Sequence, residues 1–331
     1  MAKKRRYRAA LAGYYGFGNL GDELLLRASL EALYRCGVGR ESVVVLSNAP
    51  EETEKNYNVA SVSRWSLKSV RRVLSDSDTL LLGGGGLFQD STSIKSCVWY
   101  WGLVRTARLC GAKPWALGQS IGPLRSRVAR VLTRWALSSC AALQVRDAPS
   151  MDLAKSLGLN AIQGDDLVLT LTPSVIERSE NDKKTLLINL RPDKSAEHYA
   201  ALTASYVNTF DGEVIGVAMS REDAELLERM NGKLLNLSRV VPLKSLEDAS
   251  TLWSRASEAI GMRLHFAVLS AIYGTRMAVL PYDPKAASFA DRVGAARMDD
   301  KFMPPCRPVF PVSPEKIREE ADRICKTVLN S

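Results

Sequence analysis

The sequence predicts an α/β protein made of two Rossmann-like domains, each built on a parallel sheet. Short runs rich in leucine and β-branched residues alternate with longer amphipathic segments along the chain, which is the pattern of right-handed βαβ units. The 331 residues are too many for one compact core and suit two domains of ordinary size. A polar stretch at Thr172–Lys184 separates two series of strands and is typical of a linker.

The expected domains are residues 1–175 and 176–331, and we leave open whether the last helix, Pro314–Leu329, packs back on the first domain. The first series of predicted strands is Arg8–Ala12, Ser42–Leu46, Thr79–Leu82, Trp115–Leu117 and Ala142–Val145. The second series is Thr185–Leu190, Glu213–Ala218, Lys233–Leu237, Glu258–Ile260 and Arg276–Leu280. Apolar residues at helical spacing predict helices between them, as at Leu67, Val70 and Leu74, or at Val128, Val131, Leu132 and Trp135.

The composition is that of a soluble globular protein, with 46% hydrophobic and 24% charged residues. No apolar run approaches the ~20 residues that span a membrane, and the basic N-terminus precedes too short an apolar stretch for a signal peptide. We therefore expect a cytoplasmic protein. The six cysteines are scattered without a C-x-x-C pair and there are two histidines, which argues against a metal site and favours reduced thiols.

The formal net charge of +9 has several interpretations. It fits a solvated basic surface, anionic substrates or contact with acidic lipid headgroups. No nucleic-acid recognition motif accompanies the charge, so we expect no nucleic-acid partner. Two basic groups would be drawn to an anionic membrane, and a solvated surface explains them equally well: Lys3-Lys4-Arg5-Arg6, and Arg64 with Lys68, Arg71 and Arg72.

A glycine-rich turn follows the first predicted strand and opens a helix. Gly16, Gly18 and Gly21 satisfy G-x-G-x-x-G, which is weak evidence by itself. A dinucleotide site also needs an acid after the second strand, but that strand runs into Ser47-Asn48-Ala49-Pro50. A nicotinamide-dependent enzyme therefore stays an alternative only, and we expect no nicotinamide cofactor.

Several polar and glycine residues at predicted strand ends are candidates for contacts with a sugar. Acidic capping of a helix is the alternative for two of them, and a flexible loop is the alternative for the glycine run Gly83–Gly86. The candidates are Asn19, Asp22 and Glu23 in the first turn, Gly84 and Gly85 in the glycine run, and Gln119 and Ser120 in the turn after Trp115–Leu117.

Four basic side chains also lie at predicted strand ends or helix starts. Arg146 follows the strand Ala142–Val145, where it suits a carboxylate or phosphate, although an Arg146–Asp147 surface pair is the alternative. Arg263 and His265 lie at a helix N-terminus, which attracts anions, and Lys285 begins the next helix. We expect these four side chains to converge on one cleft, since parallel strands bind ligands at their carboxyl ends.

These motifs resemble the polysaccharide pyruvyl transferases, and the closest branch is the CsaB type, which pyruvylates secondary cell-wall polymers that anchor surface-layer proteins. The most specific segments are Gly16–Glu23, Gly83–Gly86, Gly118–Pro123, Arg263–His265 and Tyr282–Lys285. The resemblance implies a GT-B-like fold, with two Rossmann-like domains facing an interdomain cleft. It implies phosphoenolpyruvate as co-substrate, no other cofactor, and a lipid-linked glycan precursor as acceptor.

The resemblance also implies roles for individual residues. Arg146, Arg263 and Lys285 would bind phosphoenolpyruvate, and His265 with Arg263 would be catalytic, His265 as the general acid. A lipid-linked acceptor would place the enzyme at the inner face of the membrane as a soluble or peripheral protein. Two other functions stay open: a GT-B glycosyltransferase that uses a nucleotide sugar, and a non-catalytic protein that binds glycans or anions.

Overall fold

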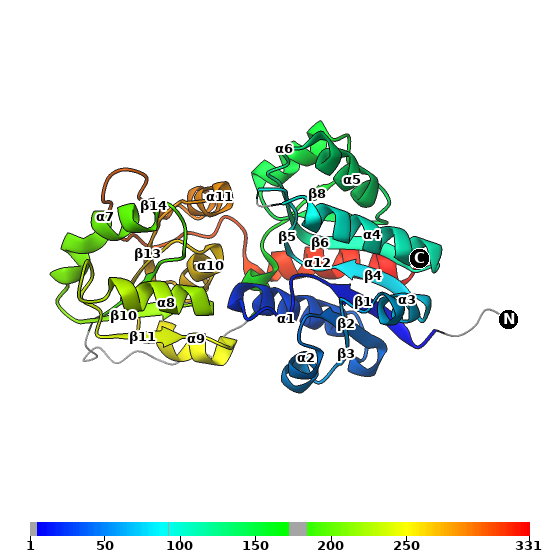
Figure 1. Ribbon diagram of the computed structural model, residues 1–331, viewed down its shortest axis with the longest axis horizontal. Helices are drawn as coiled ribbons and strands as arrows, with labels where there is room; N and C mark the ends of the chain where they lie inside the picture. Colours follow the sequence, from blue (N-terminus) through cyan, green and yellow to red (C-terminus); the bar gives the residue numbers. More distant parts are fainter. Residues whose placement is uncertain (1–4, 92, 172–183) are drawn as a thin grey trace. The chain divides into compact units, whose positions relative to one another are not determined.

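The computed structural model describes residues 5–91, 93–171 and 184–331, and the chain divides into two compact units (Figure 1). The first unit comprises the described residues up to Phe17, then Leu25–Thr170 and Pro314–Ser331; the second comprises Gly18–Leu24 and the described part of Leu171–Ser313. The linker expected at Thr172–Lys184 lies, except for Lys184, outside the described residues.

The first unit is built on an eight-stranded sheet whose order is β3-β2-β1-β4-β6-β7-β8, with β5 paired to β6. Every pair is parallel. The strand order reverses between β1 and β4. The bounds are β1 (Tyr7–Ala12), β2 (Val43–Ser47), β3 (Ala60–Ser63), β4 (Ser77–Leu82), β5 (Gly85–Phe88), β6 (Lys113–Ile121), β7 (Leu143–Val145) and β8 (Ile162–Gln163).

Helices cover both faces of this sheet, because right-handed crossovers that run in opposite directions from β1 place their helices on opposite sides. One face carries α1 (Leu20–Arg35), α2 (Pro50–Tyr57) and α12 (Pro314–Leu329). The other carries α3 (Leu67–Ser75), α4 (Lys95–Leu109), α5 (Arg127–Ser138) and α6 (Ala148–Ser156). Burial on both faces explains why the central strands read as continuous apolar runs, such as Leu80–Leu82.

The last helix belongs to the first unit. Its Asp322 accepts a fork of hydrogen bonds from Arg35 of α1, with Nη2 at 2.9 Å from Oδ1. At the end of α12, the carbonyl of Leu329 accepts from Arg8 Nη2 at 2.8 Å. Near its start, Arg318 Nε donates to the carbonyl of Thr170 at 2.7 Å. The chain therefore returns to the first sheet after it completes the second unit.

The second unit has a six-stranded parallel sheet in the order β11-β10-β9-β12-β13-β14, which reverses between β9 and β12. Its strands are β9 (Thr185–Asn189), β10 (Glu213–Ala218), β11 (Arg239–Pro242), β12 (Glu258–Gly261), β13 (Arg276–Val279) and β14 (Ala296–Arg297). Its helices are α7 (Ala196–Asn208), α8 (Arg221–Met230), α9 (Leu246–Trp253), α10 (Leu264–Ile272) and α11 (Pro284–Arg292). Among the described residues, no helix of either unit has the length and apolar character to cross a bilayer.

One predicted strand, Lys233–Leu237, is wrong. This segment forms a turn after α8, and its leucines Leu235 and Leu237 pack into the core of the second unit. The strand comes later, at β11, which has two exposed residues and ends at Pro242. An edge strand can contain few apolar residues and a proline, so the more apolar segment was not the strand.

The glycine run Gly83–Gly86 is not simply a loop, since Gly85 begins β5 and pairs with β6. The glycines are needed for close packing of the chain. A Cβ at Gly84 would lie 2.7 Å from Leu25 Cδ2 and 3.3 Å from the carbonyl oxygen of Gly118. The run therefore brings β4 and β6 together and has a packing role whether or not a ligand binds nearby.

We predict that Gly84→Ala destabilises the protein by about 1–3 kcal/mol, because the added methyl group overpacks the contact with Leu25. Gly102→Ala is the matched control, since Gly102 is inside α4 and a Cβ there meets nothing within 4 Å. That substitution should stabilise the protein by about 0.5–1 kcal/mol. Chemical denaturation of both variants measures the difference, and equal stability would contradict the packing role.

Candidate functional site

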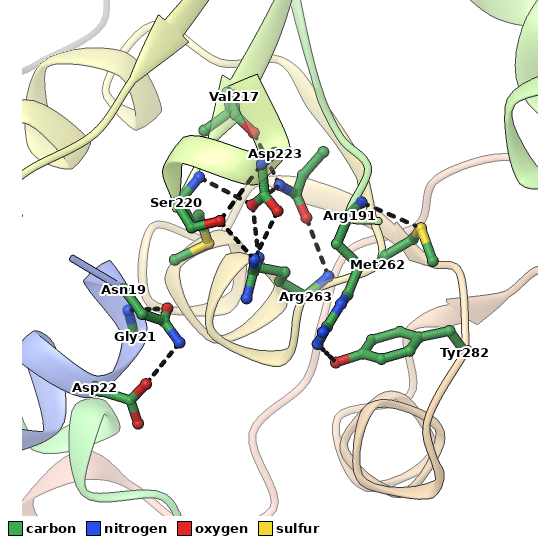
Figure 2. Close-up of polar contacts among 12 residues, drawn as sticks. Asn19, Gly21, Asp22, Arg191, Val217, Ser220, Asp223, Met262, Arg263 and Tyr282 are labelled. Carbon is green, nitrogen blue, oxygen red and sulfur yellow. Dashed lines mark hydrogen bonds and ion pairs between the residues drawn. The ribbon is translucent and has the colours of Figure 1, made fainter. Parts of the chain in front are cut away.

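The best candidate site in the second unit is the point where its strand order reverses, between β9 and β12. Open parallel sheets bind ligands outside the carboxyl ends of their strands at this point. Arg191 follows β9 and Arg263 follows β12, so two arginines lie there (Figure 2).

A fully buried asparagine joins the carboxyl ends of three neighbouring strands. Asn189 ends β9, its Nδ2 donates to the carbonyl of Val217 in β10 at 2.8 Å, and its Oδ1 accepts from the backbone N–H of Arg263 at 3.1 Å. A buried side-chain amide that makes these bonds in both directions restricts where the three strand ends lie.

Arg263 is held by a carboxylate that has no exposed surface. Its Nε and Nη2 each lie 2.6 Å from an oxygen of Asp223, and Nη2 also donates to Ser220 Oγ at 2.8 Å (Figure 2). Burial lowers the pKa of the guanidinium, but the hydrogen bonds and charge of Asp223 outweigh burial and raise this pKa above its usual value. Arg263 is therefore a fixed cation, and no described protein group accepts from its Nη1.

Arg191 is a second cation at this edge, and the sequence analysis missed it. Its Nη1 donates to the hydroxyl of Tyr282 at 2.6 Å, and its guanidinium lies 4.6 Å from the centre of that ring. Burial raises the pKa of Tyr282 although Arg191 opposes the shift, so the hydroxyl keeps its proton near neutral pH. The Nε of Arg191 is buried and has no hydrogen-bond partner among the described residues.

His265 and Lys285 lie in the first turns of α10 and α11, which start at the same edge of the sheet. Asp283 caps α11 by accepting from the backbone N–H of Lys285 at 2.8 Å. The N-terminus of a helix favours anions through its unpaired N–H groups and its dipole. This edge therefore combines two arginines, a lysine, a histidine and two helix N-termini.

The first glycine-rich turn also reaches the second unit, since Gly18–Leu24 belong to it. The N–H of Leu20 donates to the carbonyl of Met219 at 3.0 Å, and a Cβ at Gly21 would collide with the His265 imidazole. Asn19 caps α1, because its Oδ1 accepts from Gly21 N at 3.2 Å, and its Nδ2 donates to Asp22 at 2.6 Å. The structural role of this turn is capping, and sugar binding by Asn19, Asp22 and Glu23 stays a prediction.

In the first unit, two of the predicted contact residues, Arg146 and Ser120, take part in a buried network. Arg146 Nη1 lies 2.7 Å from Asp166 Oδ2, and its Nε donates to Ser120 Oγ at 3.2 Å. Ser120 in turn donates to Asp147. The alternative of an Arg146–Asp147 surface pair is wrong, because both side chains are buried.

Gln119 is also buried, and its side-chain amide donates to the carbonyls of Leu82, at 3.2 Å, and Gly83. These hydrogen bonds therefore hold the start of the glycine run that includes Gly84 and Gly85. Sugar contacts by these residues and by Ser120 stay predictions. So does the convergence of Arg146 on the other three basic residues, because Arg146 belongs to the first unit and they belong to the second.

The first unit contains a second feature that the sequence analysis missed, a set of aromatic rings around Arg64 after β3. Arg64 is buried and donates from Nη1 to the carbonyl of Gly13 at 2.8 Å. Its guanidinium lies 5.3 Å from three ring centres, so it is not a cation for a membrane surface. The three rings belong to Phe17, Trp65 and Trp99. Tyr14 stacks on Phe17 with 3.9 Å between the ring centres. Tyr14 and Trp65 are exposed.

Comparison with known proteins identifies the family. Residues 19–284 match the family described as polysaccharide pyruvyl transferase. The chain belongs to this family. It is therefore a transferase enzyme, and its family transfers pyruvyl groups to polysaccharides. No curated protein matches the sequence at a significant level.

Solved structures confirm the predicted GT-B fold class for this pyruvyl transferase. HepE of Anabaena, solved with UDP-glucose, has 11% identity and a TM-score of 0.58, with 97% of this chain and 93% of that one covered. The UDP-GlcNAc 2-epimerase of Methanocaldococcus jannaschii has 12% identity and a TM-score of 0.58, with 96% and 92% covered. MnaA of S. aureus, solved with UDP, has 9% identity and a TM-score of 0.61, with 97% and 90% covered. At these identities the likeness concerns the fold alone.

No cluster of side chains able to hold a metal ion occurs within the described part of the chain.

We predict that Arg263→Ala lowers the free energy of unfolding by about 3–5 kcal/mol, because it leaves the buried carboxylate of Asp223 without its cation. Arg191→Ala is the matched control at the same edge. It removes a hydrogen bond to a hydroxyl and should cost about 1 kcal/mol. Urea denaturation of the two variants tests this, and an Arg263 variant as stable as the control would show that the ion pair does not support the fold.

Proposed function

We propose that this enzyme transfers the pyruvyl group of phosphoenolpyruvate to two hydroxyls of a sugar in a cell-envelope glycan precursor, with release of phosphate. The observation that carries the proposal is the cationic edge of the second unit, where Arg191 and Arg263 flank the strand reversal. Phosphoenolpyruvate has a carboxylate and a phosphate on a three-carbon frame. Arginine forks and helix N-termini are suited to bind such an anion.

The side chains at this edge that can donate hydrogen bonds to an anion are of two kinds. Arg263 is already paired with Asp223, so it offers a rigid, oriented donor at Nη1 and little net charge. Arg191 is bonded to a neutral hydroxyl, so it supplies net positive charge. Lys285 is a further contact to phosphoenolpyruvate that the family resemblance implies. Arg146 is also proposed to contact phosphoenolpyruvate. To do so, it would have to exchange its hydrogen bond to Asp166 for one to the substrate.

The reaction proposed for these groups begins with proton transfer. His265 as imidazolium protonates the methylene carbon of phosphoenolpyruvate while one sugar hydroxyl adds to the central carbon. The phosphate then leaves with the electrons of its carbon–oxygen bond, and a second hydroxyl adds to the same carbon to close the ketal. The acceptor loses two hydroxyl protons in total; one ends on the new methyl group and one on phosphate. The cations offset negative charge on the leaving phosphate.

We propose that the acceptor is a lipid-linked precursor of a secondary cell-wall polymer of the kind that anchors surface layers. The enzyme would then act in the cytoplasm, at the inner face of the membrane. The exposed rings of Tyr14 and Trp65 at the carboxyl ends of β1 and β3 are suited to an apolar sugar face, and Asn48 orients Trp65 by accepting from its Nε1 at 2.8 Å.

The test is phosphate release from phosphoenolpyruvate with a panel of lipid-linked glycans, with the product examined by mass spectrometry for a pyruvate ketal. We expect turnover in the native enzyme, none in His265→Ala, and normal turnover in His198→Ala, whose imidazole is exposed on α7. Consumption of a nucleotide sugar in place of phosphoenolpyruvate would favour a glycosyltransferase and refute the proposal. Near-normal turnover of a folded His265→Ala variant would remove the general-acid role.

We also predict that Arg191→Ala raises the KM for phosphoenolpyruvate about tenfold to a hundredfold, as expected for loss of one charge-assisted hydrogen bond of about 1.5–3 kcal/mol. The KM for the acceptor should stay the same, because the substitution changes only the cationic edge at which phosphoenolpyruvate is proposed to bind. Arg191→Lys should restore part of the donor affinity by restoring the charge. Steady-state kinetics with either substrate varied separates these effects, and an unchanged donor KM would place the anion elsewhere.

A further inference from the structure

The positive charge of this protein is concentrated on three helices of the first unit. The helices α3, α4 and α5 contain three basic residues each and no Asp or Glu. By contrast, α7, α8, α9 and α11 of the second unit each contain at least one acid. The nine basic residues are Lys68, Arg71 and Arg72, then Lys95, Arg105 and Arg108, then Arg127, Arg130 and Arg134.

These three helices form one layer. They lie on the same face of the sheet, and α4 packs against α3 on one side and α5 on the other (Figure 1). Eight of the nine basic side chains are exposed, and Arg130 is half-buried. We call the outward side of this layer, with its exposed basic and apolar residues, the α3–α5 face.

The α3–α5 face also exposes large apolar side chains. Leu109 is 78% exposed, Leu67 is 72% exposed and Val131 is 65% exposed. Helix α5 has apolar residues on two sides: Ala129, Ala136 and Leu137 are buried, whereas Val128, Val131 and Trp135 point outward. The apolar pattern that predicted this helix is therefore mostly its exposed side. Exposed apolar side chains of this size on a basic surface are suited to an interaction with an apolar or amphipathic partner.

Two arginines flank a pair of tryptophans where α4 and α5 meet. The guanidinium of Arg108 lies 5.8 Å from the ring centre of Trp135, and that of Arg105 lies 5.5 Å from the ring centre of Trp101. The two tryptophan rings are 5.9 Å apart, edge to face. Tryptophan prefers the headgroup level of a bilayer, where arginine can keep its charge in water while its stem covers apolar surface.

We propose that the α3–α5 face docks on the surface of an anionic lipid bilayer. The absence of acids on these helices complements negative headgroups, and the exposed leucine, valine and tryptophan side chains can enter the boundary between headgroups and acyl chains. A second copy of the chain fits less well, because a two-fold contact would oppose two identical sets of cations. A nucleic acid would pair with the arginines but would leave the aliphatic side chains unused.

This face replaces the basic groups that the sequence suggested for membrane contact. Arg64 is enclosed by aromatic rings, and Arg5 donates to the carbonyls of Cys110 and Gly111. Lys3 and Lys4 lie outside the described residues. Only Lys68, Arg71 and Arg72 of those groups belong to the α3–α5 face. The inference does not depend on the proposed reaction, because vesicle binding needs no substrate.

The test is co-sedimentation of the full chain with vesicles of phosphatidylglycerol and phosphatidylcholine, and with vesicles of phosphatidylcholine alone. We expect binding to the anionic vesicles only, reduced at 0.5 M salt because the Debye length falls to a few ångströms. The triple variant Arg105→Gln/Arg108→Gln/Arg134→Gln should bind about a hundredfold more weakly, at roughly fivefold for each lost charge. A second variant, Leu109→Ser/Val131→Ser/Trp135→Ser, should also bind more weakly.

The matched control is Arg221→Gln/Arg229→Gln/Lys244→Gln, which removes three exposed cations of the second unit and should leave binding unchanged. Equal loss in the control and in the α3–α5 variant would show that net charge alone drives binding, and would overturn the assignment. Equal amounts of protein sedimenting with anionic and with neutral vesicles would also overturn the assignment. Sedimentation velocity tests whether a second copy of the chain covers this face instead. If the native protein is a dimer and the serine variant is a monomer with unchanged vesicle binding, the face is a contact between copies. Thermal melting of each variant confirms that it is folded.

Discussion

The geometry of the candidate site depends on one buried interaction, the pairing of Arg263 with Asp223 beside Asn189. Asp223 accepts from Arg263 and from the backbone N–H of Met219, and Asn189 bonds to both β10 and Arg263. These contacts connect the ends of β9, β10 and β12, which are the strands at the reversal of the sheet. Removal of either charge leaves the other one buried and unpaired, so the site and the stability of the second unit are coupled.

The basic residues of this protein therefore have different electrostatic roles. Arg146 and Arg263 are paired with buried carboxylates, so they add little net charge. Arg191 is paired with a hydroxyl and keeps its net positive charge. The cations of α3, α4 and α5 have no acids on the same helices and produce a field over a broad surface. A net charge of +9 alone does not distinguish these roles.

Local patterns predicted most of the fold. Alternating strands and helices identified both sheets, and the wrong strand at Lys233–Leu237 arose because a buried turn and a buried strand have the same apolar signal. The candidate site was predicted less fully. Arg263, His265 and Lys285 follow recognisable strand ends, and Arg191 follows β9 in the same way but was overlooked. Asp223 had no local signal, because its role requires a contact between residues 40 positions apart.

The sequence by itself determined the alternation of strands and helices, the family and the positions of Arg263, His265 and Lys285 at strand ends, because these depend on neighbours within about ten residues. Only the tertiary structure decided which cations are paired, which side of α5 is buried and which glycines are needed for packing. Those properties depend on distances between distant segments, as with Arg146 and Asp166 or Gly84 and Leu25. Side chains of one type therefore differ in the net charge that they contribute, according to the partner that the fold places beside them.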